Sequence, residues 1–86
     1  MSRYHETAVT MIERQIKQIR GSDYPNGEFC QGMIQANYAQ GFIDERQVEA
    51  FEQKAADAVL IRRRALHMAN MARKLGGLSQ LHGGAA

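Results

Sequence analysis

The fold is decided by residues 41–48, which read GFIDERQV. Asp44 followed three residues later by Gln47 is the pattern of a capping box, in which each side chain accepts a hydrogen bond from the other residue's backbone N–H at a helix start. Gly41 is the residue type that most often ends a helix, and only two residues separate it from Asp44. The pattern therefore predicts two helices joined by a tight turn.

The chain on either side of this turn predicts three helices. The longest runs from Glu45 to Leu75 without Gly or Pro, and Gly76 offers a stop. A second helix spans about 28–40, after a loop at 22–27 that contains Pro, Asn and Gly. A third covers 3–20, because apolar residues recur there every three to four positions. The stripe of the 3–20 helix consists of Tyr4, Ala8, Ile12, Ile16 and Ile19. The apolar residues of the 28–40 helix are Phe29, Met33, Ile34 and Tyr38.

The expected architecture is all-α: helix, loop, helix, turn and long helix, in a single domain over 1–75. The Gly-rich stretch 76–86 is expected to be a flexible tail. With 86 residues the chain has room for one small core only.

Composition excludes several classes of protein. No run of about 18 apolar residues is present, which argues against a membrane span, and the first residues do not resemble a signal peptide. Cys30 is the one cysteine, so no internal disulfide can form, which fits a reducing cytoplasm. We expect a cytoplasmic protein that does not contact membranes.

The second half of the long helix is apolar over more than one face. At 1.5 Å per residue this helix would be about 46 Å long, more than the two shorter helices can cover. Either the helix bends near Arg62 or its second half packs on another chain. We expect a homodimer, with Arg62 pairing across the interface; local packing against the first helix is the alternative. The predicted interface residues are Ile61, Arg62, Leu66, Met68 and Ala69.

The sequence contains no convincing catalytic or metal motif. His5-Glu6 begins like a zinc-binding HExxH motif, but Val9 stands where the second histidine is needed. Cys30 has no adjacent base, so a small buried core residue is the expected role. We expect no enzymatic activity, no cofactor and no metal.

An acidic face is the first candidate for function. Glu45, Glu49 and Glu52 follow the spacing i, i+4, i+7 and lie on one side of the long helix, next to Asp44. A solvated surface is the ordinary explanation of such a charge run. The functional interpretation is a docking surface for a basic host or cognate protein.

A basic helix end is the second candidate. From Ala58 onward the chain carries basic residues and no acidic one. They suggest nucleic-acid binding, although consecutive arginines fan around a helix and the acids at its start would repel phosphates. The residues of this alternative are Arg62, Arg63, Arg64, Arg73 and Lys74.

Residues 33–44, MIQANYAQGFID, running on to Phe51, resemble the short helix–Gly–helix hairpin of many small phage and mobile-element proteins. Such proteins include host-takeover factors and anti-CRISPRs, which act by binding and blocking. The resemblance implies a non-enzymatic inhibitor. It covers under a third of the chain and carries over no functional residue.

Overall fold

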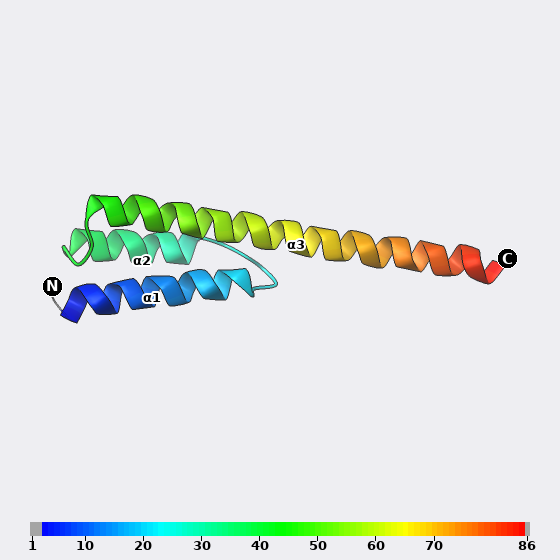
Figure 1. Cartoon of the computed structure of the whole chain (residues 1–86), viewed down its shortest axis with the longest axis horizontal. Coiled ribbons are helices and arrows are strands. Elements are labelled where there is room, and N and C mark those ends of the chain that lie inside the picture. Colours follow the sequence, from blue (N-terminus) through cyan, green and yellow to red (C-terminus); the bar gives the residue numbers. More distant parts are fainter. Residues whose placement is uncertain (1–2, 86) are drawn as a thin grey trace.

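The computed structural model describes residues 3–85, and the side chains of residues 3–76. Three helices make up the fold: α1 (Arg3–Arg20), α2 (Glu28–Ala39) and α3 (Glu45–Ala85) (Figure 1). No strand is present in this described part of the chain. The predicted all-α, three-helix order is confirmed.

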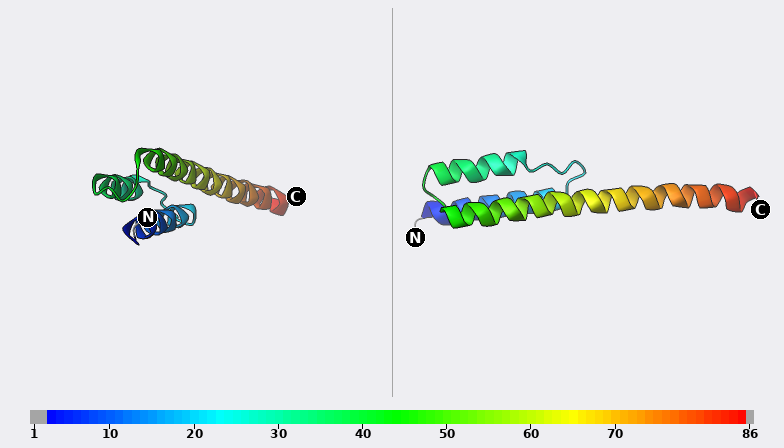
Figure 2. Two further views of the ribbon diagram at one scale, coloured as in Figure 1. Left: turned by 60° about the vertical axis from the view of Figure 1, so that its left-hand side comes forward. Right: turned by 90° about the horizontal axis from the view of Figure 1, so that it is seen from above.

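The helices α1 and α2 lie beside the first half of α3, and the second half of α3 projects beyond them (Figures 1 and 2). The molecule measures 68 × 18 × 15 Å, with a radius of gyration of 19.0 Å. A compact domain of this length would have a radius of gyration of about 12 Å. A large part of α3 therefore has no neighbour within the chain.

The core lies where all three helices meet. The α1 stripe predicted from its spacing is buried at Ala8, Ile12, Ile16 and Ile19, but Tyr4 is 63% exposed and stacks on the ring of Phe42. The rest of the hydrophobic core cluster comes from α2, the turn and the first half of α3: Cys30, Ile34, Ile43, Phe51, Ala55 and Ala58.

The apolar residues of α2 do not all face the core, whereas Cys30 is buried as expected. Phe29 is 67% exposed and Tyr38 is 38% exposed, whereas Cys30 and Ile34 are fully buried. Phe29–Met33 and Cys30–Ile34 both have a spacing of four residues, so periodicity alone does not choose between the two faces. The core accepts the smaller Cys30 side chain and leaves the Phe29 ring outside.

The turn between α2 and α3 has the predicted chemistry. The backbone N–H of Asp44 donates to Gln47 Oε1 at 3.0 Å, and the backbone N–H of Gln47 donates to Asp44 Oδ1 at 2.8 Å. Gly41 has φ of +78°, the left-handed conformation that favours glycine. The capping box and the glycine stop are confirmed.

The helix α3 continues past Leu75 to Ala85, ten residues beyond its predicted end. Gly76 keeps a negative φ, because Gly41 has the only positive φ among the described residues. A glycine inside a helix costs about 1 kcal/mol but does not terminate it as proline would. The expected flexibility of 76–86 stays a prediction, because the side chains after Gly76 lie outside the described residues.

Within the described range, no helix is both long and apolar enough to cross a membrane.

Candidate functional site

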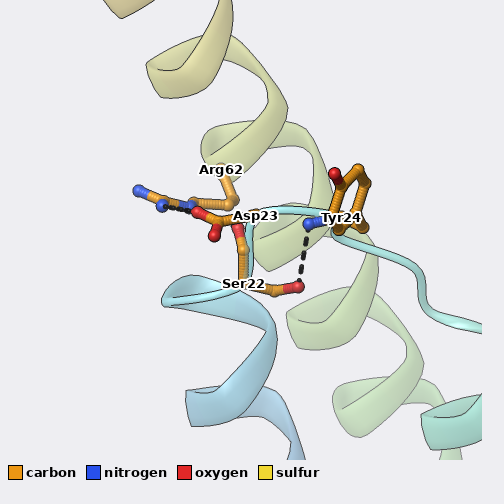
Figure 3. A network of polar contacts seen from close by, with 4 residues as sticks. All are labelled: Ser22, Asp23, Tyr24 and Arg62. Atoms are coloured by element: carbon orange, nitrogen blue, oxygen red, sulfur yellow. Dashed lines mark hydrogen bonds and ion pairs between the residues drawn. The ribbon is translucent and has the colours of Figure 1, made fainter.

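Two arginines of α3 form hydrogen bonds with the loop between α1 and α2. Arg62 Nε donates to the carbonyl oxygen of Ser22 at 2.7 Å, and an Arg62 Nη lies 3.6 Å from Asp23 Oδ1 (Figure 3). Arg63 Nη donates a longer bond, 3.4 Å, to the carbonyl oxygen of Pro25. Arg62, for which the sequence predicts a partner in a second chain, thus has its contacts within this one.

The acidic face lies along the seam between α2 and α3. Tyr38 Oη donates to Glu45 Oε1 at 3.2 Å, and Gln35 Nε2 donates to Glu52 Oε1 at 2.6 Å. Glu49, between them, is exposed. The hydrogen bond to the Glu45 carboxylate and its charge raise the pKa of Tyr38, so this hydroxyl remains a donor at neutral pH.

Asp44 acts mainly as the N-cap residue of α3. Its Oδ1 accepts the backbone N–H of Gln47, but the residue is exposed and its second carboxylate oxygen can accept further bonds. The structure therefore brings the four predicted acidic residues to one end of α3, with Glu45 and Glu52 held by side chains of α2.

A groove of about 660 Å³ continues this seam toward the middle of α3. Glu28 and Gln31 of α2 line one side. Glu52 and Arg63 line the other, over a floor that includes Ile34. The α3 side chains between them are small or aliphatic: Ala55, Ala56, Val59 and Leu60.

The predicted dimer residues divide between two sides of α3. Ile61 is 65% exposed and Met68 is 64% exposed, and they lie seven residues apart, about two turns, on one side. Arg62 and Leu66 lie on the side that continues the core and are half-buried near the loop, in line with Ala69. A single flat interface would not contain all five.

The predicted basic set is also divided. Arg62 and Arg63 are engaged by loop carbonyl groups. Arg64, Arg73 and Lys74 are exposed and have no hydrogen bond or ion pair with any described residue. Three of the five cations are therefore available to a partner.

Groups with reactive chemistry are few in the described chain. Burial raises the pKa of the Cys30 thiol, so it is protonated at neutral pH and shielded from solvent. His5 Nδ1 lies 2.8 Å from the carbonyl oxygen of Phe42, and its Nε2 lies 3.3 Å from Gln47 Nε2. Among the described residues no three His, Cys, Asp or Glu side chains gather where a metal ion could be held.

Sequence reasoning missed the α2 side chains that hold the acidic face. Tyr38 and Gln35 are three residues apart and so share one side of α2. Because a tight turn makes α2 and α3 antiparallel, that side could have been paired with the side of α3 that carries Glu45 and Glu52. The signal was present, but Tyr38 was counted only among the apolar residues of this helix.

The sequence matches no protein-family model, and neither curated proteins nor solved structures give the chain a significant match.

Proposed function

We propose that this chain is a non-enzymatic protein–protein interaction module that docks its acidic face on a basic surface of another protein. The face consists of Asp44, Glu45, Glu49 and Glu52. Support comes from one observation above all: Tyr38 and Gln35 fix the carboxylates of Glu45 and Glu52 without neutralising them. Side chains that are already ordered lose less entropy on binding than freely rotating ones.

The kind of partner follows from the sign of the charge and from the resemblance of the helix–Gly–helix segment. In this proposal the chain is a phage-type inhibitor of the host-takeover or anti-CRISPR kind. Its target is a host protein whose basic surface is complementary to the acidic face. The interaction takes place in the cytoplasm, where a lone thiol such as that of Cys30 stays reduced.

Capture from a bacterial lysate tests the proposal. The tagged chain is used as bait in nuclease-treated and untreated halves of the lysate. We expect the same basic protein to be captured from both halves.

The triple variant E45K/E49K/E52K should no longer capture this protein. The matched control, R64E/R73E/K74E, should still capture it. Circular dichroism of both variants should match the wild type, because the replaced side chains are exposed, except that of Glu52, which is half-buried. Retention of the protein by E45K/E49K/E52K would contradict the proposal.

We propose a small nucleic-acid-binding or transcription-regulatory protein as the second candidate. Support comes from Arg64, Arg73 and Lys74, which are exposed and without a partner among the described residues. Binding of labelled duplex and single strands at about 50 mM salt tests it, because non-specific electrostatic binding is strong there. Three phosphate contacts would give a slope of about −3 in log K against log salt. Absence of binding removes this candidate.

A further inference from the structure

The second half of α3 carries a row of large apolar side chains that nothing in the chain covers. Leu60 lies nine residues after the buried Phe51, about two and a half turns, so it points away from the core. The other members follow at helical spacing on the same outer side. Their exposed fractions are 57% for Leu60, 65% for Ile61, 64% for Met68, 45% for Met71 and 60% for Leu75.

An apolar row of this length on a small chain indicates an interaction surface. The distribution of charge along α3 indicates what covers this apolar row. Residues 45–57 contain four acids, Glu45, Glu49, Glu52 and Asp57, against two bases, Arg46 and Lys54. Residues 58–76 contain five bases and no acid. The helix is therefore complementary to itself when two copies run in opposite directions, and repels itself when they run in the same direction.

The register follows from Asp57 and Arg64. Both are exposed, and they lie seven residues apart, about two turns, on the outer side of α3. Asp57 accepts a hydrogen bond only from Gln53 of its own helix, and Arg64 has no bond to any described residue. A two-fold axis midway between them passes between Leu60 and Ile61, the two adjacent exposed apolar residues of α3.

We infer that α3 pairs antiparallel with the α3 of a second copy of this chain, about a two-fold axis between Leu60 and Ile61. The pairing places Asp57 of each copy opposite Arg64 of the other, twice. Lys74 of each copy then lies level with residue 47 of the other. At that level it falls between Glu45 and Glu49 along the partner helix. Met68 and Met71 lie against the short or flexible side chains of Gln53 and Ala50.

The groove beside α2 adjoins the proposed contact between the two α3 helices. Its lining includes Ala56, Leu60 and Arg63, on the flank of α3 that adjoins the outer side. A second helix laid along the outer side of α3 would border this hollow. The inference rests on the proposed function only in that both use the acidic face; the second copy and an external target would compete for it.

Sedimentation equilibrium of the full chain tests the pairing. We expect a dimer at micromolar concentration, and a dissociation constant raised at least tenfold in D57R and in R64D. The double variant D57R/R64D restores the opposite-charge pair and should recover most of the affinity. E13R, on the exposed side of α1, is the control and should change nothing. A monomer at all concentrations, or single variants that dimerise like the wild type, overturns the inference.

Disulfide trapping tests the direction of the helices. In an antiparallel pair a cysteine at Leu60 lies near its own copy across the axis, so L60C should form a covalent dimer on oxidation. A cysteine at Leu75 would lie about 43 Å from its copy, so L75C should not. Native Cys30 is fully buried and does not compete. Trapping of L75C would indicate parallel helices and overturn the inference.

The two proposals fail separately. Asp57 and Arg64 lie outside the acidic face, so D57R/R64D should still capture the basic protein from a lysate. A monomeric chain that captures it contradicts the pairing alone. A dimer that responds to D57R and R64D, but captures nothing, contradicts the proposed function alone.

Discussion

Arg62 reaches from the middle of α3 to the carbonyl oxygen of Ser22, forty residues earlier in the chain, and closes a 2.7 Å hydrogen bond. This contact holds the loop between α1 and α2 against α3 at the point where α3 leaves the bundle (Figures 1 and 3). It divides the helix into a first half that packs on its own chain and a second half that faces outward.

Replacing Arg62 should loosen this loop. R62M keeps most of the aliphatic length but removes the donor to Ser22, which should lower the free energy of unfolding by about 1 kcal/mol. The ion pair to Asp23 adds little, because that carboxylate is 82% exposed. Urea denaturation measures the change. R14M is the matched control, since Arg14 is exposed on α1 and has no partner among the described residues, and equal losses in both variants would contradict the role given to Arg62.

Gly41 and Gly32 should respond to alanine in opposite directions. Gly41 has φ of +78°, so G41A should lower the free energy of unfolding by about 1 kcal/mol. Gly32 lies inside α2, and an added Cβ there meets no atom within 4 Å. G32A should therefore raise stability by about 0.5 to 1 kcal/mol. Thermal melting of the two variants measures both changes; a stabilising G41A would mean that residue 41 does not have a positive φ.

The capping box predicts coupling between its two residues. D44A should cost about 1 kcal/mol, because the backbone N–H of Gln47 loses its acceptor at the start of α3. Q47A removes the reciprocal bond to the backbone N–H of Asp44. Because the two bonds support each other, the double variant should lose less than the sum of the single losses. Strictly additive losses in denaturant titrations would argue against a joined box.

Burial of the Cys30 thiol should affect both the pH dependence of stability and the rate at which the thiol is labelled. Burial raises its pKa in the folded state, so the folded chain binds this proton more tightly than the unfolded chain. The resulting stabilisation is complete below the thiol pKa of the unfolded chain and declines as pH rises through the higher pKa of the folded chain. Reaction with a thiol reagent at pH 7 should proceed only as fast as the chain unfolds. Fast labelling of the native chain would contradict its burial.

Much of the fold could be read from local sequence signals. The turn at 41–48 was predictable because capping depends on a few neighbouring residues and little else. The buried side of α1 was predictable because its isoleucines repeat without a competing stripe. The end of α3 was not, since Gly76 weakens a helix without stopping it.

Other features depend on partners that periodicity does not reveal. The choice between Phe29 and Cys30 for the core of α2 is made by the space that α1 and α3 leave. The contact of Arg62 with Ser22 depends on the path of a loop whose Pro and Asn indicate a turn but no destination. The acidic stripe of α3 was visible in the sequence, whereas the hydrogen bonds from α2 that hold it required the α2–α3 seam.

The most direct test of the proposed function is photo-crosslinking from position 49 of the acidic face. A photoreactive amino acid replaces Glu49, which is exposed and lies between the two fixed carboxylates, and a second version carries it at Arg14 on the exposed side of α1. Both are irradiated in a nuclease-treated bacterial lysate, and the adducts are identified by mass spectrometry. The account predicts an adduct between position 49 and a basic protein, absent when the probe is at position 14. Adducts from position 49 that contain only a second copy of the chain, or equal adducts from both positions, would contradict it.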